Sequence, residues 1–343
     1  MLNFRFTAIA LFSISVISVL DAAEPVKVFI LAGQSNMEGK AKVSLMEYQV
    51  SQPETRPLFE HLQKDGRWIK RDDVTIKFLN RYGPLTVGYG SRDRIGPELQ
   101  FGWTMGDHYQ EHVVLIKTAW GGKSLARDFR PPSSGMPAEE ELQQQLMQAK
   151  KKKPETTMED IKNSYGLYYR AMLSDIRDTL INIDVLVPDY QGQGYELAGF
   201  VWFQGWNDMV NKQYTAVYDK NMANFIRDVR KDLKSPALPF VIGQLGVGGE
   251  PRPDSKPNPG RDFFKKQQAK PASLPEFKNN VALVKTDQYW DWEADAVFSK
   301  GWRNHVEEWK KVGSDYPFHY LGSAKFHIRA GKGFAEAILK LND

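Results

Sequence analysis

Short apolar runs recur along the chain and form its strongest structural pattern. The first run precedes Ser35, and four others lie at 112–116, 198–203, 240–245 and 280–285. They are rich in Val, Ile and Phe and do not alternate with polar residues. This pattern predicts parallel strands that are covered on both faces.

Helical patterns separate these runs. Apolar residues recur at three- and four-residue spacing from Ile161 to Leu180, after a Thr157/Asp160 pair that suits a capping arrangement, and again from Tyr214 to Val229. The alternation predicts a doubly wound, three-layer α/β/α fold around a central, mostly parallel five-stranded sheet.

Three longer segments interrupt this alternation, at 42–94, 130–156 and 250–275, and are rich in Pro, Lys and Gln. We interpret them as long loop insertions in a single domain that spans residues 24–343, since no linker separates two independent cores.

The composition narrows the function classes. The 343 residues are 41% hydrophobic and carry a formal net charge of +4 without a dense basic patch, so no nucleic-acid partner is expected. The chain has no cysteine, which excludes disulfides and cysteine-ligated metals.

Residues 1–23 have the pattern of a signal peptide. Arg5 supplies the positive charge, 6–20 is almost entirely uncharged, and Ala22-Ala23 offers small residues for cleavage. We therefore expect an exported protein, periplasmic or secreted, with no stable membrane insertion after cleavage. No other stretch is long and apolar enough to cross a membrane.

Ser35 is the candidate nucleophile. In a doubly wound sheet, ligands bind beyond the carboxyl ends of the strands. A serine that follows such a strand and opens a helix presents its hydroxyl there. The letters Gly-Gln-Ser-Asn-Met are equally compatible with a structural serine that caps the helix.

Two further strand-end loops offer donors for an oxyanion. Gly121 and Gly122 follow the second run, where the absence of a Cβ lets a backbone N–H approach a ligand. Asn207 follows the third run and can present a side-chain amide. The alternatives are an ordinary tight turn for the glycines and an Asx-turn for Asn207.

The base that activates a serine near neutral pH is most often histidine. His319 precedes a C-terminal helical pattern in a loop that can reach over the sheet, whereas its competitor, His327, lies inside that pattern. Asp315 is the nearest carboxylate that could orient His319, and Asp287 or a backbone carbonyl remain alternatives. No metal-ligand set or cofactor motif is found, so neither is expected.

Three motifs together resemble a known family: Val-Phe-Ile-Leu-Ala-Gly-Gln-Ser-Asn-Met-Glu-Gly, Trp-Gly-Gly-Lys-Ser-Leu and Val-Trp-Phe-Gln-Gly-Trp-Asn-Asp. The order Ser, Gly, Asn, His is similar to the SGNH hydrolase superfamily. The motifs resemble its sialate O-acetylesterase branch, which includes the acetyl xylan esterases of carbohydrate esterase family 6.

This resemblance implies an SGNH-type, flavodoxin-like sheet and a role for each matching residue. Ser35 is the implied nucleophile, His319 the base, and Ser35, Gly122 (or Gly121) and Asn207 the oxyanion hole. Gln34, Gln204 and Trp206 are implied to line the acyl or sugar pocket. One departure is that Asp315 precedes His319 by four residues, whereas the superfamily commonly has Asp-x-x-His.

The expected function is hydrolysis of O-acetyl groups from sugars, either acetylated polysaccharide or sialic acid, through an acyl-enzyme. The candidates for stacking on the sugar are the aromatic residues near strand ends, namely Trp120, Trp202, Trp206, Tyr289 and Trp290. Two rivals remain: an O-acyltransferase whose site excludes water, and a catalytically silent glycan-binding protein.

Overall fold

The computed structural model of the chain describes residues 24–253 and 255–343. The predicted signal peptide at 1–23 lies outside the described residues.

A seven-stranded sheet organises the fold, with the strand order β11-β10-β9-β1-β8-β5-β6. Its strands are β1 (Val26–Gly33), β5 (Arg71–Phe78), β6 (Arg81–Leu85), β8 (Val113–Ala119), β9 (Tyr195–Phe203), β10 (Phe240–Gln244) and β11 (Val281–Lys285). Every neighbouring pair is parallel except β5 and β6. The structure confirms the mostly parallel α/β sheet, whereas the predicted number of five strands was wrong.

The two additional strands, β5 and β6, lie in a segment that we predicted to be a loop. β5 begins with Arg-Asp-Asp and carries Lys77, which forms an ion pair with Asp175 of a helix. β6 contains Gly83 and Pro84, residues that are depleted in central strands and tolerated at an edge. Because of these charges and strand-breaking residues, the sequence did not predict the hairpin at the edge of the sheet.

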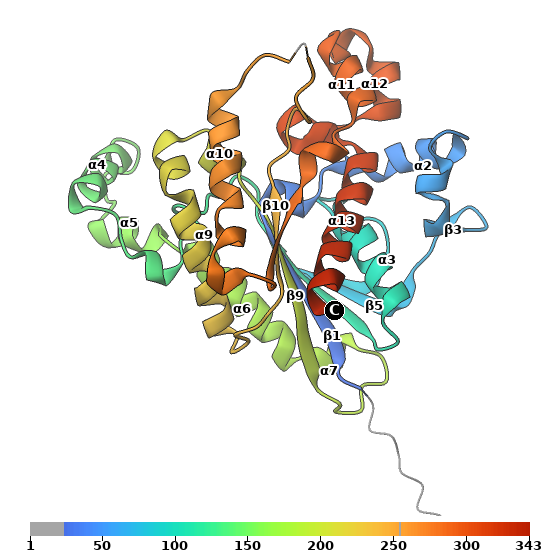
Figure 1. Cartoon of the computed structure of the whole chain (residues 1–343), viewed down its shortest axis with the longest axis horizontal. Coiled ribbons are helices and arrows are strands. Elements are labelled where there is room, and N and C mark those ends of the chain that lie inside the picture. Colours follow the sequence, from blue (N-terminus) through green and yellow to red (C-terminus); the bar gives the residue numbers. More distant parts are fainter. Residues whose placement is uncertain (1–23, 254) are drawn as a thin grey trace, which may run out of the picture.

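Helices cover both faces of the sheet (Figure 1). One layer contains α3 (Glu98–His108) and α13 (Ala324–Asn342), and the other contains α6 (Leu167–Ile181), α9 (Lys212–Asp232) and α10 (Pro259–Ala269). In β1, Phe29 and Leu31 face the first layer, while Val28 and Ile30 face the second. Apolar partners on both faces explain why the strand runs do not alternate with polar residues.

The remaining elements are short. The α-helices are α1 (Ser35–Glu38), α2 (Val43–Ser51), α4 (Glu139–Lys150), α5 (Met158–Ser164), α7 (Ile183–Leu186), α8 (Trp206–Met209), α11 (Trp292–Ser299) and α12 (Val306–Val312). The 3₁₀ helices are η1 (Arg56–Leu58), η2 (Glu60–Leu62), η3 (Pro132–Ser134), η4 (Pro271–Ser273), η5 (Pro275–Phe277), η6 (Thr286–Tyr289), η7 (Trp302–Asn304) and η8 (Pro317–Gly322). Two small antiparallel pairs join β2 (Ala41–Lys42) to β7 (Arg94–Ile95) and β3 (Gln63–Lys64) to β4 (Arg67–Trp68).

The predicted insertions are not loops throughout. The segment 42–94 also contains α2, 130–156 contains α4, and 250–275 contains α10. In α4 and α10 few side chains are buried, so the apolar stripe that identifies a helix in a sequence is weak.

The helical stripe from Ile161 to Leu180 forms two helices, α5 and α6, not one. The predicted capping box is present, because the Thr157 side chain accepts from the Asp160 N–H and the Asp160 side chain accepts from the Thr157 N–H. Gly166 interrupts the stripe with a φ of +66°, and its N–H donates to Arg127 O at 2.8 Å. The second predicted stripe forms the single helix α9.

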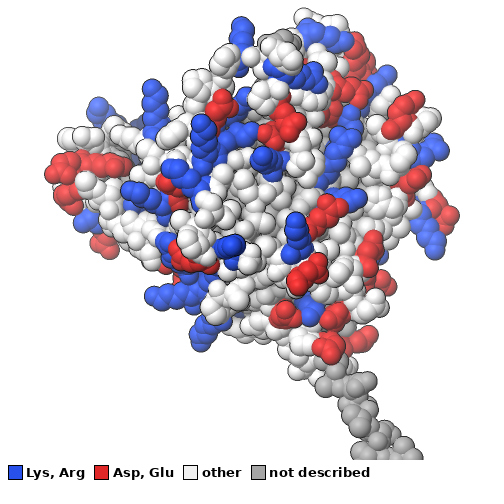
Figure 2. Space-filling model, viewed as in Figure 1, with Lys and Arg blue, Asp and Glu red and all other residues white. Residues whose placement is uncertain are grey.

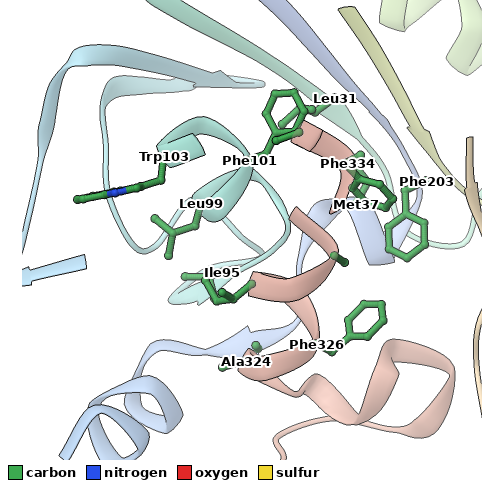
Figure 3. Packing of buried hydrophobic residues seen from close by; sticks show 14 of the residues in the cluster. Leu31, Met37, Ile95, Leu99, Phe101, Trp103, Phe203, Ala324, Phe326 and Phe334 are labelled. Carbon is green, nitrogen blue, oxygen red and sulfur yellow. The ribbon is translucent and has the colours of Figure 1, made fainter. Parts of the chain in front are cut away.

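The first hydrophobic layer is continuous across several elements. The rings of Phe326 and Phe334 of α13 lie 6.3 and 5.3 Å from that of Phe203, within the cluster that also contains Leu31 and Met37 (Figure 3). This packing holds α13 against α3 and the strands β9, β10 and β11, while the preceding turn η8 contacts α1 and β2.

The surface carries charges of both signs. On the face seen in Figure 2, Lys and Arg are interspersed with Asp and Glu, so the net positive charge is not gathered into one patch there. Across residues 24–253 and 255–343, none of the helices combines the length and the apolar character needed to cross a membrane.

The central strands end side by side, which places three loops at one edge of the sheet. Gly33 at the end of β1 pairs with Ala119 of β8 and with Phe203 of β9. Gly33 has a φ of +154°, and a Cβ there would lie 2.2 Å from Phe203 O. Only glycine lets the chain turn this close to β9.

Candidate active site

Ser35 is the first residue of α1 and follows the turn at Gly33 and Gln34. It is only 5% exposed. Because β1 is the central strand of the sheet, this turn projects above the middle of its carboxyl edge.

The structure brings Ser35, His319 and Asp315 together in one hydrogen-bonded chain. His319 Nε2 lies 3.0 Å from Ser35 Oγ, and His319 Nδ1 lies 2.9 Å from Asp315 Oδ1. An ionised Asp315 accepts the Nδ1–H, which leaves Nε2 unprotonated and able to accept the Ser35 hydroxyl proton. This arrangement matches the nucleophile, base and orienting acid of serine hydrolases.

Asp315 is held in its ionised form. Burial alone would raise the pKa of its carboxyl, but hydrogen bonds from His319 and the Tyr316 N–H, with Arg94 at 3.7 Å, bring that pKa below its usual value. The alternative acid, Asp287, instead forms an ion pair with Lys265 of α10.

The turn η8 accommodates the four-residue separation of Asp315 and His319. The N–H groups of His319 and Leu321 both donate to Tyr316 O, at 2.9 and 3.0 Å. Tyr320 and Leu321 have positive φ angles of 50° and 62°, which fold the chain back into α13. The compact turn therefore directs both side chains toward Ser35.

Asn36 links the two halves of the site. Its Nδ2 donates to Phe318 O at 3.2 Å, across 282 residues of chain. Sequence reasoning missed this residue. One feature of the sequence could have identified Asn36 as a site residue, namely its position directly after Ser35 in the same strand-end turn.

Gly121 and Gly122 both lie in the loop after β8. A Cβ at Gly121 would lie 3.8 Å from Ser35 Cβ and 3.4 Å from Glu38 Oε2, so this glycine is the direct neighbour of Ser35. Gly122 has a φ of +73°, and a Cβ there would have no atom within 4 Å. The turn needs Gly122 for its backbone conformation and places Gly121 closest to the nucleophile.

Asn207 is oriented by Gln34. Gln34 Nε2 donates to Asn207 Oδ1 at 3.3 Å, and Gln34 Oε1 accepts from the Gly205 N–H at 3.2 Å. Since its oxygen is engaged, Asn207 presents its amide nitrogen to other partners. Gln34, predicted to line the pocket, is 2% exposed, and both ends of its side chain amide bind the loop after β9.

The sequence profile of one family matches most of the chain. That family is described as "Carbohydrate esterase, sialic acid-specific acetylesterase", and the match covers residues 25–297. The protein belongs to this family. It is accordingly an ester hydrolase of the carbohydrate acetylesterases. The match contains Ser35, Gly122 and Asn207 and ends before Asp315 and His319.

Two solved structures share the fold of the esterase at low sequence identity. A protein from Arabidopsis thaliana is 16% identical, with a TM-score of 0.51, and the match covers 92% of this chain and 98% of that one. NanS is 15% identical, also with a TM-score of 0.51 and the same coverages. A carbohydrate acetylesterase from Xanthomonas citri is 13% identical, with a TM-score of 0.43 over 75% of this chain and 49% of its own. No curated protein matches the esterase by sequence.

Gln204 and Asp208 form an interior network beneath the site of the esterase. Gln204, predicted to line the pocket, is 2% exposed, and its Nε2 donates to Asp208 Oδ2 at 2.6 Å and to Lys123 O at 3.0 Å. The N–H groups of Leu125 and Ala126 donate to the Asp208 carboxylate at 2.8 and 2.9 Å. Burial raises the pKa of Asp208 to about 6, against the effect of these donors. Asp208, which sequence reasoning did not select, fastens the loop that carries Gly121 and Gly122.

Trp206 and His327 have different surroundings. Trp206 is half-buried, and its ring lies 5.7 Å from that of Phe318, beside His319. His327 is fully buried in α13, and its Nε2 accepts from the Lys40 N–H at 3.4 Å. Burial lowers the pKa of His327 to about 3. None of the described His, Asp or Glu residues belongs to a group of three or more that could hold a metal ion.

We expect the stability advantage of His327 over glutamine to fall as the pH falls. The unfolded chain takes up a proton at His327 near pH 6.5, whereas the folded chain does so only near pH 3. The contribution of His327 to the stability of the fold is therefore complete above pH 6.5 and is lost as the pH falls toward 3. Between pH 7 and pH 5 the difference in unfolding free energy between wild type and His327→Gln should decrease by about 2 kcal/mol. Urea unfolding at pH 7, 6 and 5 measures it, and a difference that does not change with pH would contradict the buried neutral imidazole.

Proposed function

We propose that this esterase hydrolyses O-acetyl groups from sugars through an acyl-enzyme on Ser35, with His319 as the base and Asp315 as the orienting acid. The observation that carries the proposal is the continuous hydrogen-bonded chain from Ser35 Oγ to His319 at 3.0 Å and from His319 to Asp315 at 2.9 Å. Membership of a carbohydrate acetylesterase family supports the acetylated sugar as substrate.

In the proposed first step, Ser35 Oγ attacks the acetyl carbonyl while His319 Nε2 takes up the hydroxyl proton. Asp315 stabilises the resulting imidazolium. The negative oxygen is held by donors from Ser35, Gly122 or its neighbour Gly121, and Asn207. His319 then gives its proton to the departing sugar alcohol.

In the second step, water attacks the acetyl-enzyme, and His319 takes a proton from that water. Acetate leaves, and the proton returns to Ser35 Oγ. The pairing of Ser35 with His319 favours an active enzyme over the silent glycan-binding alternative, because such a protein would not need a base beside the serine. The acetylesterase family favours hydrolysis over acyl transfer.

We also propose that the protein is exported, since Arg5 and the uncharged stretch 6–20 have the composition of a signal peptide. Mass spectrometry of the chain recovered from the periplasm or medium tests this. A protein that stays in the cytoplasm with residues 1–23 attached would overturn export.

A labelling experiment tests the acyl-enzyme. A fluorophosphonate reagent should modify Ser35, identified by peptide mass spectrometry, and abolish acetate release from acetylated xylan, pectin and sialic acid in parallel with an aryl acetate. Full acetate release from a labelled protein, or a label on another serine, would overturn the assignment of Ser35.

A further inference from the structure

Four aromatic rings form a continuous row that begins at the candidate active site. Trp206 is next to Asn207 in the chain, and Phe318 is next to His319, with the two rings 5.7 Å apart. Tyr316 stacks on Phe318 at 5.5 Å with an interplanar angle of 6°, and the edge of Trp302 meets Tyr316 at 6.5 Å. We call Trp206, Phe318, Tyr316 and Trp302 the aromatic row.

The members of this row are accessible at the surface. Tyr316 is 42% exposed, and the other three are half-buried. By contrast, two of the residues that sequence reasoning offered for sugar stacking, Trp202 and Trp290, are 0% and 3% exposed and belong to the core. Of the row, only Trp206 was among the sequence candidates, whereas Phe318 comes from η8, Tyr316 directly precedes η8 and Trp302 comes from η7.

The row is attached to the same turn that carries the base. Tyr316 and Phe318 lie between Asp315 and His319, so the hydrogen bonds that fix His319 also fix these rings. Arg303 lies over the Trp302 ring at 4.8 Å and donates to the Tyr316 hydroxyl at 3.3 Å. Arg303 is exposed, so its remaining donors are accessible to a ligand.

Beyond Trp302 the surface is hollowed. A groove of about 600 Å³ lies between α2 and α12, and its lining includes Trp302, Trp309, Tyr48, Lys42 and Lys311. Figure 1 shows α11 and α12 standing together as a small lobe beyond the N-terminal end of α13. The surface beside His319 therefore continues along the aromatic row to this lobe, and it carries aromatic rings and cationic side chains.

We propose that Phe318, Tyr316, Trp302 and Arg303 form a subsite for the sugar residues that adjoin the acetylated one, so that the preferred substrate is an acetylated oligosaccharide. The inference rests on the proposed function, because it takes the acetylated sugar to lie at Ser35. Aromatic rings bind the apolar C–H faces of sugars, while guanidinium groups donate to hydroxyl or carboxylate oxygens.

The test compares matched substrates of two lengths. Acetylated xylose is paired with acetylated xylotriose, and O-acetylated sialic acid with O-acetylated sialyllactose. In the pair that the wild-type esterase hydrolyses, kcat/KM for the trisaccharide should exceed that for the monosaccharide about tenfold or more. Equal values within that pair would overturn the subsite.

Two variants and one control locate the effect. Trp302→Ala and Arg303→Ala should each lower kcat/KM for the trisaccharide about tenfold, mainly through KM, and leave the monosaccharide and an aryl acetate unchanged. Tyr195→Ala removes a 43% exposed tyrosine at the opposite end of β9 and should change none of the three rates. If the variants lower all three rates equally, the rings only support His319 and the subsite is wrong.

The outcomes separate this inference from the proposed function. Hydrolysis of the aryl acetate but of neither sugar pair would overturn sugar specificity and the subsite together. Fluorophosphonate labelling of a serine other than Ser35 would overturn the assignment of Ser35 and, with it, the position of the acetylated sugar. Equal kcat/KM values within the sugar pair, with Ser35 labelled, would overturn the subsite alone.

Discussion

Replacement of Ser35 by alanine is expected to lower kcat for acetate release by a factor on the order of 10⁶. The reason is the geometry of the site: Oγ is the atom that His319 Nε2 contacts at 3.0 Å, and alanine removes that atom without changing the backbone of α1. Any remaining turnover should reflect water attack assisted by the oxyanion donors alone. Acetate release from an aryl acetate, measured with purified protein, gives the ratio.

Two companion variants make the Ser35→Ala result specific. Asn207→Ala should lower kcat by about 10² to 10³, the typical loss for one oxyanion donor. Ser174→Ala removes an exposed hydroxyl on α6 and should leave kcat unchanged. Urea unfolding should show all three variants folded, and a Ser35→Ala protein with wild-type kcat would exclude Ser35 as the nucleophile.

The core of the site was predictable because it follows directly from strand ends. Ser35, Gly122 (or Gly121) and Asn207 come within a few residues of three apolar runs, and parallel strands in register bring such positions to one edge. The choice between Asp315 and Asp287 was not predictable. It depends on the direction of a turn, which the positive φ angles of Tyr320 and Leu321 determine.

Hydrogen bonds in the interior were harder to predict than positions at the strand ends. Gln34 and Gln204 have the polar character of pocket residues, yet both are buried and bind other parts of the protein. Asp208 and Asn36 join segments that are 83 and 282 residues apart. Sequence spacing carries no information about such long-range partners, so these hydrogen bonds could be identified only from the structure.

Lys117 is a buried charged residue that made the end of a strand difficult to predict. The predicted strand stopped at Ile116, whereas β8 continues through Lys117 to Ala119. Lys117 is 0% exposed because Glu98 of α3, also 0% exposed, supplies a carboxylate at 2.7 Å. A lysine in an apolar run normally indicates the end of a buried strand, since unpaired buried charges are costly.

Replacement of Lys117 by methionine is expected to lower the free energy of unfolding by about 3 to 5 kcal/mol. Its Nζ donates to Glu98 Oε2 at 2.7 Å, Glu38 O at 2.8 Å and Tyr89 O at 2.9 Å, so the change leaves a buried carboxylate and two carbonyls without this donor. Burial lowers the pKa of Lys117, but the Glu98 carboxylate opposes that shift. Because Glu38 O belongs to the last residue of α1, kcat should fall as well. Urea unfolding and aryl acetate turnover measure the two effects.

A second substitution distinguishes the loss of the ion pair from a general packing defect. In Lys117→Met/Glu98→Gln neither member of this buried pair carries a charge. The glutamine Oε1 can still accept from the Gly96 N–H, which donates to Glu98 at 2.8 Å in the wild type. The double variant should therefore recover at least half of the lost stability. Lys310→Met breaks an exposed pair with Glu307 and should change stability by only about 0.5 kcal/mol or less. If the double variant is less stable than Lys117→Met alone, the unpaired Glu98 carboxylate is not the origin of the loss, and the anchoring of Glu38 and Tyr89 must account for it.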